Sequence, residues 1–139
     1  MAGHTIVGGQ IVPDDLERIR GAVEVGSRDP EVDAIIVTGG TGVGPRDVTP
    51  EAIAPLLERE LPGFGELFRM LSWQEIGAAA YASRAVAGVA AGTVVFALPG
   101  SRAAVRLALE RLVLPEVAHL VGEVRGRRAH RHHGAASSK

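Results

Sequence analysis

The 139-residue sequence contains no cysteine, which excludes disulfide bonds, a thiolate zinc site and a cysteine nucleophile. It contains no run of about 18 apolar residues, so we expect no membrane-spanning helix. Aromatic residues make up only 4% of the chain, which argues against nucleic-acid modules that stack bases on aromatic rings. The first residues also lack the basic-then-apolar pattern of a signal peptide. Together with the missing cysteines, this favours a cytoplasmic protein.

Hydrophobic residues make up 46% of the 139 residues, which is enough to bury a core and indicates one globular domain. The net charge of −1 is unevenly spread, since the last stretch of chain carries basic side chains and no acid. We therefore expect a domain over residues 1–124 and a basic, disordered tail over residues 125–139. His130, His132 and His133 beside arginines could bind a metal or nucleic acid. An unstructured basic tail is the commoner interpretation, so nucleic-acid binding is disfavoured.

The order of apolar patterns predicts strands that alternate with helices. Strands are expected at Thr5–Val12, Val32–Val37 and Thr93–Leu98, while residues 83–91 are ambiguous. Helices are expected at about residues 14–25, 49–60, 64–71, 73–80, 102–113 and 115–124, with Thr49 and Ser72 among the N-caps. This alternation predicts an α/β domain with a mainly parallel sheet, in which ligands bind beyond the carboxyl ends of strands.

The first candidate site is the loop Thr38-Gly39-Gly40-Thr41-Gly42, which follows a predicted strand. Three glycines let backbone N–H groups approach an anion, and two threonines add hydroxyl donors. The loop is neither a Walker sequence nor a dinucleotide fingerprint, because no Lys-Ser/Thr pair follows its last glycine and the spacing of the fingerprint is absent. The alternative is an ordinary tight loop between strand and helix.

Charged residues next to predicted helix starts are the second group of candidates. Asp47 could cap the helix that follows it or coordinate a metal ion near phosphates. Arg46 could pair with a phosphate, or it could be a solvated surface arginine. Asp14 and Asp15 also precede a predicted helix, where a carboxylate is usually a cap.

The third candidate is Pro99-Gly100-Ser101, which follows the predicted strand Thr93–Leu98. A helix begins directly after these residues, and its first N–H groups could bind an anion. The alternative is an ordinary turn in which Ser101 caps the helix.

Several of these motifs occur together in an order that resembles the MoaB/Mog molybdopterin-binding family. The resemblance covers about residues 3–124, and the form of the loop before Asp47 is closer to MoaB than to Mog. The motifs that carry it are Thr38–Gly42, Pro45–Glu51, Glu60–Glu66, Ser83-Arg84 and Leu98–Ser101.

The resemblance implies a three-layer α/β/α sandwich that assembles as a homotrimer or homohexamer. It implies adenylation of molybdopterin by MgATP, which yields adenylyl-molybdopterin and pyrophosphate. Thr38–Gly42 would hold phosphate, with Arg46 and backbone dipoles as cationic partners. Pro99, Gly100 and Ser101 would line the pterin or nucleotide pocket. Asp47 and Asp14 match the family's two functionally important carboxylates, and Asp47 would hold Mg²⁺.

The same resemblance leaves other functions open. One is a non-catalytic molybdopterin-binding or scaffold protein of the same pathway. Another is the related domain of molybdotransferases and competence-damage proteins, which the length of the chain disfavours. The family's first strand, Ser-Asp-rich loop and helix have no counterpart here. We therefore expect either that the chain is a fragment or mis-started product or that the strand Thr5–Val12 repacks. We also expect adenylation by this 139-residue chain to be impaired or absent.

Overall fold

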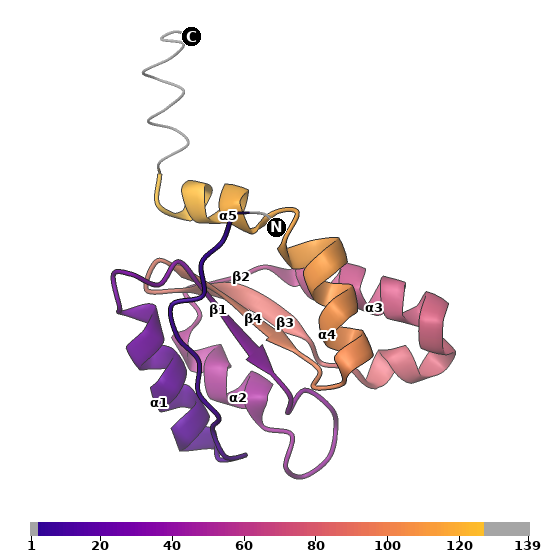
Figure 1. Cartoon of the computed structure of the whole chain (residues 1–139). Helices are drawn as coiled ribbons and strands as arrows, with labels where there is room; N and C mark the ends of the chain where they lie inside the picture. Colours follow the sequence, from indigo (N-terminus) through magenta and orange to yellow (C-terminus); the bar gives the residue numbers. More distant parts are fainter. Residues whose placement is uncertain (1–2, 127–139) are drawn as a thin grey trace, which may run out of the picture.

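The computed structural model describes residues 3–126, which form an α/β domain around one sheet (Figure 1). The strands are β1 (Ala34–Thr38), β2 (Arg59–Glu60), β3 (Val86–Ala90) and β4 (Thr93–Leu98). The α-helices are α1 (Leu16–Ser27), α2 (Thr49–Ile53), α3 (Pro62–Ile76), α4 (Arg102–Ala108) and α5 (Val117–Val124). Ala54–Leu56 and Gly77–Ala82 are 3₁₀ segments, and Leu109–Val113 is π-helical. The predicted α/β class is confirmed.

The sheet has the order β1-β4-β3-β2 and is mixed. β1 runs parallel to β4, whereas β3 is antiparallel to both β4 and β2. The expected mainly parallel arrangement is therefore wrong in this detail. The reason is the two-residue turn Ala91-Gly92, with φ values of 51° and 79°, which joins β3 and β4 as a hairpin.

Helices cover both faces of the sheet, which gives the expected three layers (Figure 1). β4 is buried along its whole length, and its side chains alternate between the two faces. Val94, Phe96 and Leu98 pack in one core with residues of α3, α4 and α5. Val95 and Ala97 pack in a second core with residues of α1 and α2. β4 is thus the element that both cores share.

The expected strand Thr5–Val12 does not form. Its residues precede α1 without regular structure, and Ile6 and Ile11 are 91% and 100% exposed. Residues 7–12 run beside β1 and leave a cavity there. A strand is stable only when its backbone pairs in a ladder, and within residues 3–126 β1 pairs with β4 alone.

The central helices also differ from expectation. The helix predicted over residues 49–60 ends at Ile53, because Pro55 has no N–H for a helical bond and Arg59–Glu60 pair with β3. The two helices predicted over residues 64–80 are largely one, α3, which ends at Gly77 with φ of 70°. Ser72 is consequently a buried residue inside α3 and not an N-cap.

The end of the domain is fixed by Arg125, the first residue of the predicted tail. Its guanidinium donates to the Gly92 and Val32 carbonyl oxygens at 3.1 and 3.0 Å and pairs with Asp33. Gly126 is also described, and residues 127–139 of the predicted disordered tail lie outside the described residues. Over residues 3–126, every helix is too short or too polar to cross a membrane.

Candidate functional site

Two loops that the sequence singled out lie against each other at the carboxyl ends of β1 and β4. These strands are parallel neighbours, with Thr38 opposite Leu98, so the segments that follow them emerge at the same edge. The Gly39 N–H donates to the Leu98 carbonyl oxygen at 2.8 Å. A Cβ atom on Gly100 would lie 3.3 Å from the Gly39 Cα. The fold therefore brings the Thr38–Gly42 loop and Pro99-Gly100-Ser101 together, as a ligand site at this edge requires.

Thr49 fixes the start of the segment over residues 38–47, which is called the glycine loop below. Its Oγ1 donates to the Gly39 carbonyl oxygen at 2.9 Å, and its N–H donates to the Gly40 carbonyl oxygen at 3.0 Å. Gly39 and Gly40 have φ values of 98° and 74°, which favour glycine. The N-cap position of α2 is Val48, so the expectation that Thr49 caps this helix is wrong. In the loop itself Thr41 is 2% exposed, so its hydroxyl is not accessible as the expected donor to a ligand.

Asp47 closes the far end of the glycine loop. Its Oδ2 accepts the Gly44 N–H at 2.8 Å, and its own N–H donates to the Gly44 carbonyl oxygen at 3.0 Å. It does not cap α2, so one of its two expected uses is contradicted. Its neighbour Arg46 is exposed. The carboxylate is thus held next to the glycines of the loop, beside Gly42 and Gly44.

Two of the predicted caps are confirmed. Asp15 accepts the Arg18 N–H at 3.0 Å and caps α1. Ser101 Oγ accepts the Ala104 N–H at 3.1 Å and caps α4, as the simpler interpretation of this turn predicted. Gly100 and Ser101 are exposed and Pro99 is half-buried, so the turn remains accessible beside Gly39.

Asp14 lies in a different part of the site from Asp47. It lines a cavity of about 490 Å³ along the open edge of β1, together with Thr38, Gly39 and Thr49. Asp47 and Pro99-Gly100-Ser101 do not line this cavity. The fold therefore brings Asp14 to the start of the glycine loop and holds Asp47 at its end.

Arg84 is the site residue whose role sequence reasoning missed. Its Nε and Nη2 donate to the carbonyl oxygens of Gly42 and Asp47 at 2.8 and 2.7 Å, and its Nη1 pairs with Glu51. The hydrogen bond from Arg84 is the main cause that lowers the pKa of the Glu51 carboxyl. The motif Ser83-Arg84 was visible in the sequence, but nothing in its spacing indicated contact with a loop forty residues earlier.

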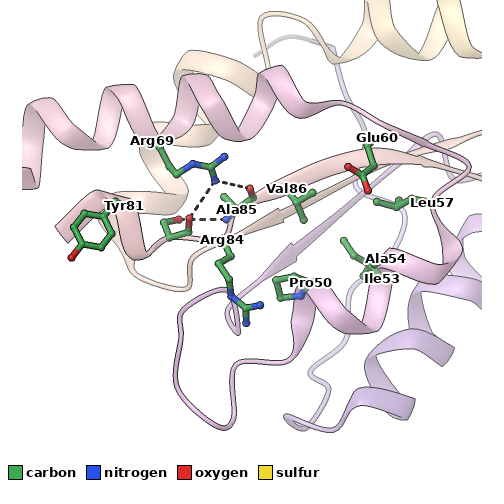
Figure 2. A pocket seen from close by; sticks show the side chains of 11 residues that line it. Pro50, Ile53, Ala54, Leu57, Glu60, Arg69, Tyr81, Arg84, Ala85 and Val86 are labelled. Carbon is green, nitrogen blue, oxygen red and sulfur yellow. Dashed lines mark hydrogen bonds between the residues drawn. The ribbon is translucent and has the colours of Figure 1, made fainter. Parts of the chain in front are cut away.

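A second cavity, of about 460 Å³, lies beside Arg84 (Figure 2). Its walls include the apolar side chains of Ile53, Leu57 and Val86. At one end Arg69 Nη1 donates to the carbonyl oxygens of Ser83 and Ala85, both at 3.2 Å. This arginine therefore fixes the backbone on either side of Arg84. No local sequence pattern indicated this cavity, because its walls include residues of α2, α3 and β3 that are far apart in the chain.

Asp47 is a carboxylate that could hold a cation together with the phosphates of a ligand. Between residues 3 and 126 there is no group of three or more His, Asp or Glu side chains that could hold a metal. Mg²⁺ is commonly bound through one or two carboxylates together with substrate phosphates. A single carboxylate, Asp47, next to a glycine-rich loop fits that donor set.

Comparison with known proteins agrees with this geometry. The profile of a family described as "probable molybdopterin binding domain" matches residues 1–119. Molybdenum cofactor biosynthesis protein B of Bacillus subtilis is 53% identical over 125 residues, which cover 89% of this chain and 74% of that protein. A crystal structure of a molybdenum cofactor biosynthesis protein B superposes with a TM-score of 0.86 at 49% identity, covering 89% and 78% of the two chains. The tungsten cofactor synthesizing protein MoaB of Pyrococcus furiosus gives 0.71 at 41% identity, covering 84% and 73%.

Proposed function

Because the chain belongs to the molybdopterin-binding domain family, we propose that it acts in molybdenum cofactor biosynthesis as a molybdopterin adenylyltransferase. The observation that carries the proposal is the contact between Gly39 and Gly100. It joins a glycine-rich loop and a capped turn at the carboxyl ends of two parallel strands, where phosphate ligands bind in α/β sheets. Molybdopterin is the ligand to which the family's description refers.

In the proposed reaction an oxygen of the molybdopterin phosphate attacks the α-phosphorus of ATP. A new P–O–P bond forms, the bond from the α-phosphorus to the bridging oxygen breaks, and pyrophosphate leaves. Such transfers depend on positioning and on donors aimed at the phosphate oxygens more than on covalent chemistry from the protein. Backbone N–H groups of the glycine loop would supply those donors, and Arg46 lies exposed beside them.

Asp47 is the residue that would hold the magnesium ion of MgATP. When bound, this ion neutralises negative charge that develops on the phosphates. Asp47 is kept next to the loop by the Gly44 N–H, which leaves its second carboxylate oxygen for a cation. Asp14 would position the substrate from the other end of the loop.

The test is to incubate the purified protein with molybdopterin, ATP and Mg²⁺ and to measure adenylyl-molybdopterin. Asp47→Asn keeps an oxygen that can accept the Gly44 N–H but removes the charge, so we expect product to fall by about 10²-fold. Asp29→Asn is the matched control, because Asp29 also accepts a backbone N–H, from Glu31 at 2.9 Å, outside the site. Equal product from wild type and Asp47→Asn would contradict the proposal.

A non-catalytic role in the same pathway is the second candidate. It is favoured by the separation of the two carboxylates, because Asp14 lines a cavity that Asp47 does not line. Molybdopterin binding without pyrophosphate release would select this role. Absence of both binding and product would contradict both candidates.

A homotrimer or homohexamer, implied by the family resemblance, is part of the same proposal. Several large apolar side chains of α3 are exposed, among them Met70 at 55% and Trp73 at 59%. Monomeric proteins seldom expose so many apolar side chains on one helix. Sedimentation equilibrium of the full chain tests this, and a monomer at micromolar concentration would contradict it.

A further inference from the structure

Arg84 holds the glycine loop at three carbonyl groups. Besides its two side-chain bonds to Gly42 and Asp47, its backbone N–H donates to the Thr41 carbonyl oxygen at 2.8 Å. In Figure 2 the Arg84 side chain extends toward Pro50 from the segment just before β3. One residue thus holds both the middle and the end of the loop.

These bonds determine which way the peptide groups of the loop face. In a trans peptide the carbonyl of one residue and the N–H of the next point in opposite directions. Because Arg84 binds the carbonyls of Thr41 and Gly42, the N–H groups of Gly42 and Val43 face away from it. Neither of these N–H groups donates to an acceptor within residues 3–126. Their donors are therefore free for an anion, and the carbonyl dipoles that would repel it are turned to the other side.

Glu51, a residue of α2, also contacts Arg84; the bonds of Arg84 to Thr41, Gly42, Asp47 and Glu51 are called the loop clamp below. Its carboxylate pairs with Arg84 Nη1, and it lies in the first turn of the helix that follows the loop. The Arg84 side chain is 35% exposed, so water competes only in part for these bonds. The planar guanidinium of Arg84 contacts Gly42, Asp47 and Glu51 at the same time, which the single ammonium group of a lysine cannot do.

We propose that Arg84 is a positioning residue that turns the peptide N–H groups of the glycine loop toward the phosphates of the nucleotide. This role rests on the adenylation proposed above. Arg84 donates hydrogen bonds to the loop, so it acts through the geometry of Thr41, Gly42 and Asp47.

Arg125 provides a matched control, because it makes the same set of bonds elsewhere. Its Nε and Nη2 donate to two backbone carbonyl oxygens, and its Nη1 pairs with a carboxylate. These partners, Gly92, Val32 and Asp33, precede β4 and β1 and lie at the opposite end of the strands from the loop. Arg125→Lys therefore removes the same kind of clamp without touching the loop.

The experiment compares Arg84→Lys, Arg125→Lys and the wild type. Calorimetric titration with MgATP measures the dissociation constant, and NMR hydrogen exchange measures the protection of the Gly44 and Thr49 amides. For Arg84→Lys we expect the dissociation constant to rise about tenfold and these two amides to exchange at least about tenfold faster. Thermal unfolding is expected to show that Arg84→Lys and Arg125→Lys lower the unfolding midpoint by similar amounts. Arg125→Lys should nevertheless leave the dissociation constant for MgATP and the exchange rates of the two amides within twofold of wild type.

Unchanged affinity and unchanged loop exchange in Arg84→Lys would overturn the proposal, and so would equal losses in Arg84→Lys and Arg125→Lys. Wild-type protein that binds MgATP but forms no adenylyl-molybdopterin would contradict the adenylation alone. The comparison of affinities between the variants would still decide the role of Arg84.

Discussion

Gly40 has a left-handed backbone conformation, with φ of 74°, and it lies close to the Thr49 side chain. A Cβ atom there would lie 2.3 Å from Thr49 Oγ1, which would displace the hydroxyl that holds Gly39. We expect Gly40→Ala to lower the free energy of unfolding by at least about 2 kcal/mol, from backbone strain and the lost hydrogen bond. Gly39→Ala is the control, because φ is positive but no atom lies within 4 Å, and about 1 kcal/mol is expected. Urea unfolding measures both; a smaller loss in Gly40→Ala than in Gly39→Ala would contradict this account.

Glu51 should make the loop clamp sensitive to acid. Its pKa is lowered in the folded protein, chiefly by the hydrogen bond from Arg84. A group of this kind stabilises the fold above its ordinary pKa, and that contribution is lost as the pH falls through the lowered folded-state pKa. We expect an NMR titration of the Glu51 carboxyl carbon to have its midpoint below the usual glutamate range. In Arg84→Ala the midpoint should return to that range. Identical midpoints in the two proteins would show that Arg84 is not the cause.

Some residues of the candidate site could be predicted from neighbouring residues in the sequence, whereas others depend on contacts between distant positions. The glycine loop and Asp47 could be predicted because loop composition and helix starts are visible in consecutive residues. The pair between Arg84 and Glu51 joins positions 33 residues apart, and no local pattern reports such a contact. The anchoring of Gly44 by Asp47 was also missed, since an aspartate before a helix usually caps it.

At the scale of elements, α1 and β4 were predicted to within about two residues. A capping aspartate and a continuous apolar run are strong local signals. β2 and β3 were not predicted, because β2 has two residues and β3 is rich in alanine and glycine. Their existence depends on pairing with each other and with β4. The expected strand at Thr5–Val12 fails for the converse reason, since β-branched residues without a paired neighbour do not form a ladder.

The hairpin between β3 and β4 contains strain that a substitution can remove. Ala91 has φ of 51°, in the left-handed region that alanine seldom adopts, and it is exposed. Asparagine is favoured at this position of a two-residue hairpin turn that ends in glycine. We expect Ala91→Asn to raise the free energy of unfolding by about 0.5–1 kcal/mol. Ala91→Val should lower it, because a β-branched side chain tolerates this backbone poorly. Thermal unfolding of both variants checks the prediction, and a stabilising valine would contradict it.

At the scale of the whole molecule, the sheet separates two groups of loops. The carboxyl ends of β1 and β4 carry the glycine loop and the Ser101 turn, while the opposite ends carry Val32 and Gly92. Arg84 constrains the glycine loop of the first group, and Arg125 constrains the second group. Because each arginine binds carbonyl groups from distant segments, these contacts are long-range and could not be predicted from the sequence.

Arg125 should therefore contribute to the stability of the whole domain. It connects the end of α5 to the segments that precede β1 and β4, and its side chain is 26% exposed. We expect Arg125→Ala to lower the free energy of unfolding by about 1–2 kcal/mol, because two carbonyl groups lose a charged donor. Arg111→Ala, at an exposed arginine of the π-helical segment, should change it by less than about 0.5 kcal/mol. Urea unfolding of the two variants separates these values. Equal effects would mean that the end of α5 is held by packing through Val117 and Val121 and not by the arginine.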